Sequence, residues 1–166
     1  MTKEELCNDV TAYRPIIYRF AFSCTGNRFD ADDVVQDTFL KLYQHKKGFA
    51  SEEHKKAFLL RVASNKCKDL FKSAWFRKRT PLDENIPAND CFSKSENILR
   101  EYVLRLKPNY RAVIYLFYYE GYTVSEIANI LKMSETAVTT RLSRARNELK
   151  IELINNKEEL IYEYIQ

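Results

Sequence analysis

The sequence predicts an all-α protein built from two small helical domains joined by a flexible linker. The 166 residues include only three glycines and four prolines, so long stretches are free to form helices. Apolar residues recur at helical spacing along most of the chain, and no useful length alternates in the manner of a strand. Hydrophobic residues make up 45% of the chain, which is enough to form real cores.

The N-terminal domain is predicted to contain three helices. Thr2 and Glu5 have the Thr-x-x-Glu spacing of a capping box, which marks the start of the first helix. Gly26 and Gly48 interrupt the helical pattern, and Ser51 is placed to cap the third helix. These signals predict helices over residues 2–24, 30–45 and 51–78.

The helical pattern stops after residue 79 and returns after Ser95. Pro81, Pro87 and several acids lie in between, so residues 80–94 are predicted to be a flexible linker. The predicted domains are therefore residues 1–79 and 95–166.

The C-terminal domain carries its own start and stop signals. Pro108 suits the first turn of a helix that should end at Gly121. Thr123 and Glu126 form a second capping box, which opens a short helix to Leu131. Ser134 is then expected to cap a last, long helix through about residue 154.

Charge is distributed unevenly along the chain. Residues 1–40 hold four Lys/Arg against seven Asp/Glu, whereas residues 61–79 hold seven Lys/Arg against one acid. This separation suggests one surface for a protein partner and another for a polyanion. Uneven solvated helix faces explain the charges equally well at this point.

The remaining composition argues against a metal site, a membrane protein and an enzyme. Cys7, Cys24, Cys67 and Cys91 form no Cys-x-x-Cys pair, and there are only two histidines, so we expect no metal and no cofactor. Reduced thiols in a cytoplasmic protein are the simplest account, and a disulfide switch is the alternative. No apolar run reaches membrane-spanning length. No catalytic residues are recognisable: paired carboxylates in a convincing setting, a phosphate-binding glycine loop and a nucleophile–His pair are all missing.

The end of the chain has the plan of a helix-turn-helix. Ile127, Ala128 and Leu131 are predicted to pack against Val138 and Leu142, with the small Ala128 at the closest approach. The exposed side of the last helix then carries short polar and arginine side chains that can reach bases and phosphates in a major groove, and Arg146 and Lys150 extend its positive charge. An ordinary helical hairpin with solvated arginines is the alternative. The candidate DNA-binding residues are Ser134, Glu135, Thr136, Thr139, Thr140, Arg141 and Arg144.

The second predicted helix has two different faces. Its core face is predicted to consist of Val34, Val35, Thr38, Phe39 and Leu42. The opposite face carries a stripe of acids and an amide around one leucine, namely Asp33, Gln36, Asp37 and Leu40. Such a stripe can dock a protein, although a solvated face with a single leucine is the commoner arrangement.

The third predicted helix combines an apolar stripe with a basic face. Leu59, Ala63, Cys67, Leu70 and Ala74 form the stripe. The basic face could attract a nucleic-acid backbone while nearby aromatic residues stack on unpaired bases. Alternatively, at least one of Phe71, Trp75 and Phe76 closes the core. The face consists of Arg61, Asn65, Lys68 and Lys72, followed by Arg77, Lys78 and Arg79.

The C-terminal segment resembles the C-terminal domain of bacterial sigma factors. The resemblance covers residues 95–150 and rests on Leu106-Lys107-Pro108, Gly121-Tyr122-Thr123, Glu126-Ile127-Ala128 and Arg141-Leu142-Ser143-Arg144-Ala145-Arg146. It implies that the last helix reads the upstream promoter element. Lys132 stands where the family usually has glycine, which predicts a left-handed residue there at a cost of roughly 1 kcal/mol. Thr139 and Thr140 stand where Lys or Arg is common.

The N-terminal segment resembles two further parts of the same family. Residues 30–39 look like the segment that grips the clamp helices of the largest polymerase subunit, which implies that role for Asp33, Gln36, Asp37 and Leu40. Residues 58–65 look like the segment that captures the melted promoter element, which implies that Asn65, and more weakly Phe49 in the preceding loop, contact a flipped base.

The chain is therefore identified as resembling the extracytoplasmic-function (ECF) sigma factors, because it has no room for the intervening domain of larger sigma types. The implied partners are core RNA polymerase, including its second-largest subunit, promoter DNA in double- and single-stranded form, and an anti-sigma factor. A conventional helix-turn-helix regulator with a sensing or dimerising N-terminal half is the alternative, but it gives no reason for the Asp33 stripe or for the face around Asn65.

Overall fold

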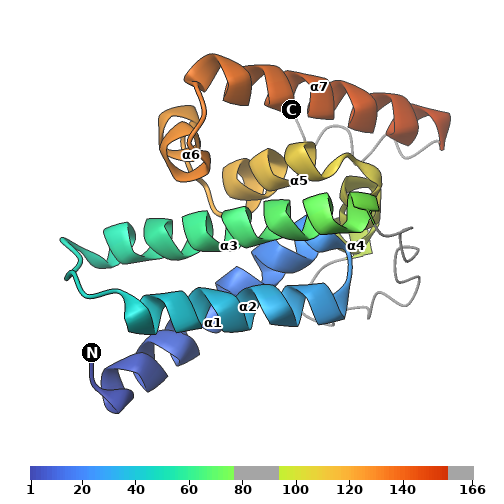
Figure 1. The fold of residues 1–166 in the computed structure, drawn as a ribbon. Helices are drawn as coiled ribbons and strands as arrows, with labels where there is room; N and C mark the ends of the chain where they lie inside the picture. Colours follow the sequence, from blue (N-terminus) through green and yellow to red (C-terminus); the bar gives the residue numbers. More distant parts are fainter. Residues whose placement is uncertain (77–93, 157–166) are drawn as a thin grey trace. The chain divides into compact units, whose positions relative to one another are not determined.

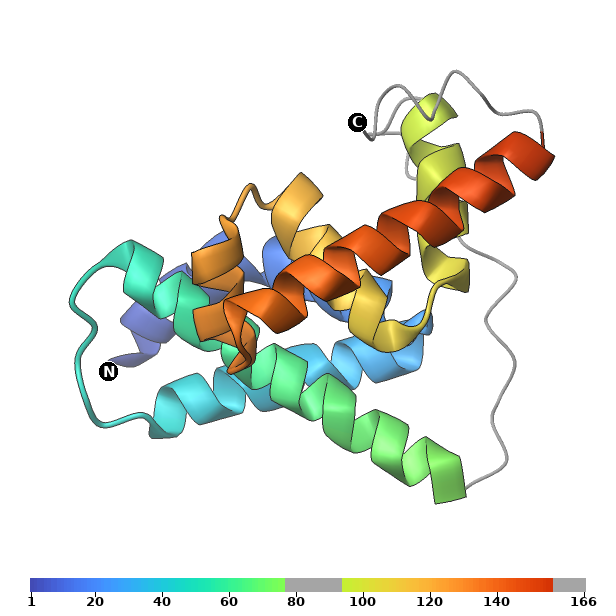
Figure 2. The same cartoon turned by 90° about the horizontal axis from the view of Figure 1, so that it is seen from above.

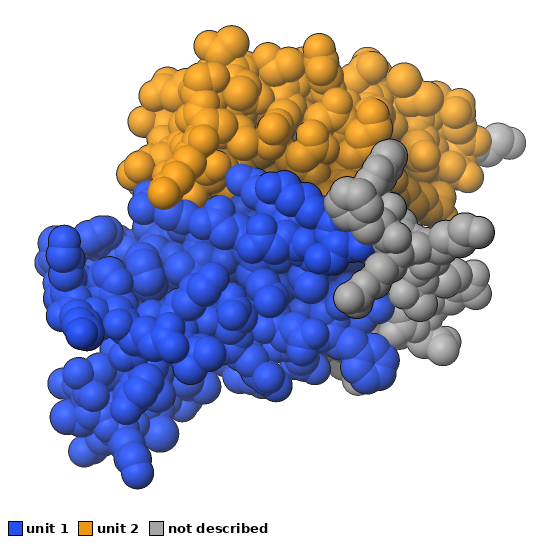
Figure 3. Space-filling model, in the orientation of Figure 1, with its two compact units in different colours: residues 1–83 blue, residues 84–166 orange. Residues whose placement is uncertain are grey.

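A computed structural model describes residues 1–76 and 94–156 of the chain. The described residues form seven α-helices and one π-helical turn, without a strand among them, which confirms the all-α prediction. The chain divides into two compact units, residues 1–83 and 84–166 (Figures 1 and 3). The predicted linker falls outside the described residues except for Lys94, so its extent and flexibility stay predictions.

Unit 1 is a bundle of three helices around one core. Helices α1 (Lys3–Thr25), α2 (Arg28–Gln44) and α3 (Glu52–Phe76) each contact the other two (Figure 1). The side chains that close the core are fully buried and come from all three helices. The largest of them are Ile17, Phe20, Leu42, Leu59 and Leu60.

The helices of unit 1 begin at side-chain caps. Thr2 and Glu5 form the predicted capping box, with the Thr2 hydroxyl accepting from the Glu5 amide at 3.1 Å and Glu5 accepting from the Thr2 amide at 2.6 Å. The Ser51 hydroxyl accepts from the His54 amide at 3.1 Å at the start of α3. The predicted start of α2 was wrong by two residues, because Asn27 is not only part of the break but also the cap of α2.

Unit 2 contains the other helices, and its core lies beneath α7. The elements are α4 (Lys94–Arg105), α5 (Pro108–Ile114), the π-helical turn η1 (Tyr115–Tyr119), α6 (Val124–Leu131) and α7 (Glu135–Asn155). Helix α7 contacts α4, α5 and α6 (Figure 2). It contributes Leu142, Leu149 and Leu153 to the core, opposite Leu116 and Ile127.

The single helix predicted between Pro108 and Gly121 changes its winding before it ends. The turn at Tyr115–Tyr119 is π-helical, and the Glu120 amide donates to the Tyr115 carbonyl at 3.2 Å. The chain leaves the helix through Gly121 with φ of 70°, a left-handed conformation that favours glycine. The predicted end is confirmed, whereas the π-helical turn had no signal in the sequence.

No helix in the described parts of the chain is both long enough and apolar enough to cross a membrane.

Candidate functional site

The outer face of α2 is an exposed stripe of acidic, polar and apolar side chains. The predicted core residues Val34, Val35, Thr38, Phe39 and Leu42 are all buried, which fixes the orientation of the helix. On the opposite face Asp33, Gln36 and Leu40 are exposed, whereas Asp37 is half-buried. The structure therefore brings these four predicted docking residues together along one face of one helix.

The acids on and beside this face differ in their partners. Asp37 forms an ion pair with Lys41 at 3.1 Å, and Asp32 forms one with Arg14 at 3.7 Å. Asp33 makes no ion pair with any described side chain. Burial, and secondarily the neighbouring carboxylate of Asp33, raise the pKa of Asp30. The carboxylate of Asp33 is therefore exposed to solvent without a described cation beside it.

Helix α3 presents the predicted polar face to solvent. Leu59, Ala63 and Cys67 are buried on the opposite side, and Leu70 is half-buried. Asn65, Lys68 and Lys72 are exposed, whereas Arg61 is half-buried. The structure therefore places Asn65 between basic side chains on one face. The side chains of residues 74–76 and the basic run 77–79 lie outside the described part.

The loop between α2 and α3 holds Phe49 within an aromatic cluster. The Phe49 ring stacks on His45 with ring centroids 4.9 Å apart and lies 5.2 Å from Phe58. The Phe49 and His54 rings are close to perpendicular, with ring centroids 5.7 Å apart. The loop and the first two turns of α1 line an open pocket of about 750 Å³, with Phe49 in its wall. The ring is therefore held in place by its neighbours and is only half-buried.

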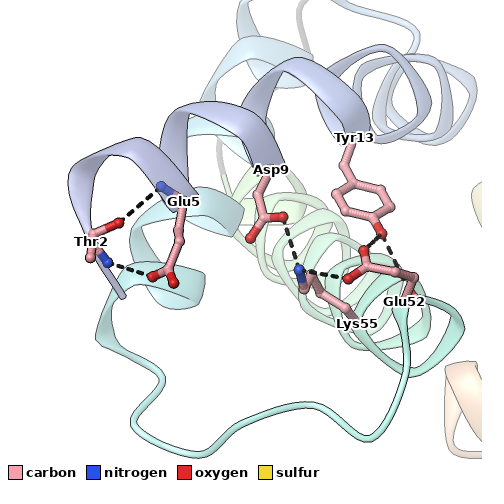
Figure 4. A network of polar contacts seen from close by, with 6 residues as sticks. All are labelled: Thr2, Glu5, Asp9, Tyr13, Glu52 and Lys55. Carbon is pink, nitrogen blue, oxygen red and sulfur yellow. Dashed lines mark hydrogen bonds and ion pairs between the residues drawn. The ribbon is translucent and has the colours of Figure 1, made fainter.

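A network of polar contacts joins α1 to the start of α3 beside this loop (Figure 4). Lys55 reaches Asp9 at 2.9 Å and Glu52 at 3.2 Å, and the Tyr13 hydroxyl donates to the same Glu52 carboxylate. Burial, reinforced by Glu52, raises the pKa of Tyr13, while the hydrogen bond from Tyr13 lowers the pKa of Glu52. The hydrogen bond to Asp9 raises the pKa of Lys55, so Lys55 and Glu52 stay charged together. The network fixes the end of the loop that carries Phe49.

The helix-turn-helix is present as predicted. Thr123 and Glu126 form the capping box of α6, and the Ser134 hydroxyl accepts from the Ala137 amide at 3.1 Å. Lys132 is left-handed, with φ of 52° and ψ of 56°. The side chains that were predicted to join the two helices are all buried: Ile127, Ala128, Leu131, Val138 and Leu142.

The exposed face of α7 carries the predicted recognition residues. Arg141 is half-buried, and the other six are exposed, namely Ser134, Glu135, Thr136, Thr139, Thr140 and Arg144. The Thr139 hydroxyl donates to the Glu135 carbonyl at 3.0 Å, which orients that side chain along the helix. This surface therefore carries hydroxyl groups toward the start of α7 and guanidinium groups after them, and it offers both base-edge and phosphate contacts.

Arg146 has a contact that sequence reasoning missed. Its Nε atom donates to the Tyr118 hydroxyl at 2.6 Å, and its guanidinium lies 5.3 Å from the centre of the Phe117 ring. This side chain therefore joins α7 to the π-helical turn, in addition to the predicted extension of the positive charge along the helix. Because Tyr118 is 28 residues away in sequence, no local pattern could reveal the pair.

The described cysteines and acids show no metal-binding arrangement. Cys7 is exposed while Cys24 and Cys67 are buried, and all three are free thiols. Within residues 1–76 and 94–156, His, Cys, Asp and Glu side chains form no group that could hold a metal ion. Cys91 lies outside the described residues.

Two family models match the chain, one in each unit. "Sigma-70 region 2" matches residues 10–77, and "Sigma-70, region 4" matches residues 96–149. The first covers the faces of α2 and α3, and the second covers the helix-turn-helix. Together they match more than half of the chain.

Curated relatives and solved structures agree with these models. The chain is 30% identical over 147 residues to the ECF RNA polymerase sigma factor SigL of Mycobacterium tuberculosis, covering 83% of this chain and 82% of SigL. It is 25% identical to SigW of Bacillus subtilis over 87% and 86% of the two chains. The sigma factor RpoE of Bartonella quintana, solved with the anti-sigma factor NepR, has a TM-score of 0.75 at 23% identity, with 92% and 98% coverage. CnrH, solved with the cytosolic domain of CnrY, has a TM-score of 0.66 at 25% identity, with 93% and 90% coverage.

Proposed function

This chain belongs to the ECF type of the sigma-70 family, and we propose that its two units divide the work of promoter-specific transcription initiation between them. Sigma factors bind core RNA polymerase and promoter DNA. In this proposal unit 1 docks on the polymerase and holds melted DNA, while unit 2 reads duplex DNA upstream. The chain itself performs no bond chemistry. In the same proposal residues 80–94 serve as the flexible connection between the units. Limited proteolysis of the free protein tests this connection.

The docking site on core polymerase is the exposed face of α2. Asp33, Gln36, Asp37 and Leu40 share this face, and the core residues on the other side fix its direction. We assign the clamp helices of the largest subunit as its partner, with further contact to the second-largest subunit. The free carboxylate of Asp33 supports a basic partner surface, because burying it without a cation would be costly.

The upstream promoter element is read by the exposed face of α7. In a helix-turn-helix the second helix enters the major groove and contacts base edges with its N-terminal residues. Thr136, Thr139 and Thr140 lie toward that end, and Arg141 and Arg144 follow directly after them. Arginine forms bidentate contacts with guanine, so these two side chains are the strongest candidates for sequence discrimination.

The melted strand is captured by α3 and the loop before it. Asn65 offers an amide that both donates and accepts, with Lys68 and Lys72 beside it for the phosphates. Phe49 provides an aromatic ring that stacks on His45 at the edge of an open pocket. Extracting a base costs a few kcal/mol, which stacking and hydrogen bonds in the pocket must return.

An anti-sigma factor is the proposed regulator of this chain. CnrH, at 25% identity, was solved with the cytosolic domain of CnrY, and its fold aligns over most of this chain. A partner that covered the α2 face or the α7 face would prevent polymerase or promoter binding. The exposed apolar groups on α2 make that face the better candidate for masking.

The observation that carries the proposal is that one chain presents both an acidic, apolar helix face and a hydroxyl-rich, basic helix face. A conventional helix-turn-helix regulator accounts for the second face alone. The test is transcription from a cognate promoter by core polymerase and the purified protein, with no other sigma factor present. Initiation at a defined start site supports the proposal. DNA binding without initiation, by a protein that does not bind core polymerase, supports the regulator instead.

A further inference from the structure

The pocket beside Phe49 has two walls, and only one of them belongs to the elements assigned to strand capture. One wall is the loop between α2 and α3, which carries Phe49. The other wall is the first two turns of α1, where Met1, Glu5, Asn8 and Asp9 line the pocket. The width of the pocket therefore depends on how the start of α1 is held against the loop and the start of α3.

The middle of the loop is not held by hydrogen bonds. Residues 46–48 form no hydrogen bond or ion pair with any described residue. The loop is anchored instead where it enters α3, because the Ala50 amide donates to Nδ1 of His54 at 3.3 Å. The Phe49 ring also lies 5.2 Å from the ring of Phe58 on α3. The position of the loop wall therefore follows the start of α3.

Lys55 links this start of α3 to α1 (Figure 4). Its ammonium group lies 2.9 Å from the Asp9 carboxylate on α1 and 3.2 Å from the Glu52 carboxylate on α3. The side chains of Lys55 and Asp9 are only 16% and 13% exposed, so water screens this pair less than a surface ion pair. Tyr13, one turn further along α1, donates its hydroxyl hydrogen to Glu52. Two contacts between the helices are therefore joined through the Lys55–Glu52 pair.

Lys55 also balances the charge of the pocket. The lining holds equal numbers of acids and lysines, namely Glu5, Asp9, Glu52, Lys46, Lys47 and Lys55. Without the Lys55 charge, Asp9 would be a largely buried carboxylate that lacks its cation, which is costly. The acids would then outnumber the lysines around a strand whose phosphates are negative. Both consequences act against a nucleic-acid strand in the pocket.

We propose that Lys55 is a positioning residue for strand capture: by binding both Asp9 and Glu52, it holds the α1 wall and the loop wall of the pocket at a fixed separation. Lys55 acts through these walls and not by contacting DNA. The inference rests on the proposed capture of melted DNA and adds α1 to the elements that take part in it. Because the charged groups are paired in the free protein, little of the pocket must be ordered when a strand enters.

A role of the network in the stability of unit 1 alone leads to a different expectation. The proposed docking face of α2 belongs to the same three-helix bundle. Unfolding of unit 1 would therefore lower the affinity for core polymerase together with the affinity for the melted strand. Loss of positioning lowers the strand affinity alone. Measuring both affinities on the same preparation separates the two roles, and thermal unfolding reports on the bundle itself.

The experiment uses the full-length chain bound to core polymerase and a fluorescent single-stranded oligonucleotide with the non-template sequence of the melted promoter element. Lys55→Met should weaken oligonucleotide binding by roughly 10-fold, as expected when a hydrogen bond to a charged group is lost. Lys55→Arg should keep most of the affinity, because its guanidinium can still bind carboxylates. Lys66→Met is the matched control, a second half-buried lysine of α3 that lies outside the network, and it should bind like the parent. The affinity for core polymerase should be unchanged in all three.

Asp9→Asn separates positioning from a direct contact between Lys55 and DNA. The variant removes the charge that holds Lys55 but leaves Lys55 itself in place. Positioning predicts weaker oligonucleotide binding, by a factor comparable to that of Lys55→Met. A direct contact predicts unchanged or tighter binding, because a released lysine and one acid fewer both favour a polyanion. Unchanged or tighter binding by Asp9→Asn would overturn the inference.

The outcomes also separate this inference from the function on which it rests. If Lys55→Met and Asp9→Asn bind the oligonucleotide like the parent while Asn65→Ala or Phe49→Ala does not, the positioning role is wrong and strand capture stands. If none of these four variants changes the affinity, unit 1 does not capture the strand, and both fail. If Lys55→Met loses affinity for core polymerase and for the oligonucleotide in parallel, the network only stabilises unit 1, and the positioning role is again wrong.

Discussion

Helices α2 and α7 are built alike but present opposite chemistry. Each buries a stripe of aliphatic side chains, and each exposes a face whose residues make few contacts within the protein. The α2 face combines acids with large apolar groups, whereas the α7 face combines hydroxyl groups with arginines. The first composition suits a protein helix and the second suits DNA. The packing therefore sets where a face points, and the exposed residues set the chemistry that the face offers.

The two helices also begin in the same way. A left-handed residue precedes each start, and a side-chain cap follows it: Gly26 and Asn27 before α2, Lys132 and Ser134 before α7. Gly26 adopts its φ of 67° without a Cβ penalty, whereas Lys132 adopts a φ of 52° at a cost of roughly 1 kcal/mol. The two starts therefore reach the same backbone geometry with different residue types at the left-handed position.

The largest expected effect comes from reversing the charge of the α2 face. Asp33→Arg combined with Asp37→Arg should abolish measurable binding to core polymerase, with an affinity loss of roughly 100-fold or more. The new arginines would face the proposed basic partner surface, and like charges at an interface cost several kcal/mol. Far-ultraviolet circular dichroism should be unchanged, since neither side chain is in the core. Asp69→Arg is the control, an exposed acid of α3 off the docking face. Parent-like affinity of the folded double variant would remove the docking assignment.

The next largest effect is expected on the α7 face. Arg141→Ala and Arg144→Ala should each weaken upstream promoter binding by about 1–3 kcal/mol if the lost contact is a bidentate one to a base. Titrations against cognate and scrambled duplexes at several salt concentrations measure this, with Asn147→Ala on the same helix as the control. An arginine that contacts only phosphate would weaken both duplexes alike and reduce the salt dependence. If both variants match the parent, α7 does not read the DNA.

The third prediction concerns strand capture by α3 and the loop before it, which combine a polar helix face with an aromatic ring. Asn65→Ala should preserve core binding and duplex binding yet reduce promoter opening, since it removes one exposed amide without touching the core. Permanganate reactivity of unpaired thymines with saturating polymerase measures the effect, and Phe49→Ala should behave in the same way. The Asn109→Ala variant, which removes an exposed amide from α5 of unit 2, serves as the control. Normal opening by the Asn65 variant would contradict the capture role alone.

The smallest expected effect comes from a substitution that makes the two helix starts alike. Lys132→Gly should raise the free energy of unfolding by up to about 1 kcal/mol, because glycine adopts the left-handed conformation without a Cβ clash. Lys150→Gly is the matched control and should lower it by a similar amount, because Lys150 lies in a regular helix. Urea unfolding of both variants and the parent checks the opposite signs. A loss of stability in Lys132→Gly would show that its side chain has a stabilising contact.

Local signals predicted most of the fold. The capping boxes at Thr2 and Thr123, the cap at Ser134 and the left-handed Lys132 all follow from short-range chemistry, and all are present. The sequence was less informative about Asn27, because asparagine is typical both of helix breaks and of helix caps. Its place at the cap became clear only from the amides that it accepts from.

The site was predictable where one helix carries it and less so where elements meet. Periodicity alone places Asp33, Gln36 and Leu40 on one exposed face. It does not show that Arg61 is half-buried, that Arg146 bonds to Tyr118, or that Tyr13 reaches Glu52, since these depend on how separate elements pack. Phe29 and Tyr43 follow the same periodicity as these three residues, but only the structure shows that both rings are exposed.

The π-helical turn at Tyr115–Tyr119 has a consequence for changes in chain length. A π-helical turn holds about one residue more than an α-helical turn, so it stores a residue that a regular helix would not need. A deletion of one residue here can be absorbed by reversion to α-helical winding, with Gly121 still free to end the helix. The residues on either side of the deletion would then keep their faces, because the turn loses only the residue that α-helical winding does not need. The contact between Tyr118 and Arg146 would be the first to be lost, and the helix-turn-helix would persist without that support.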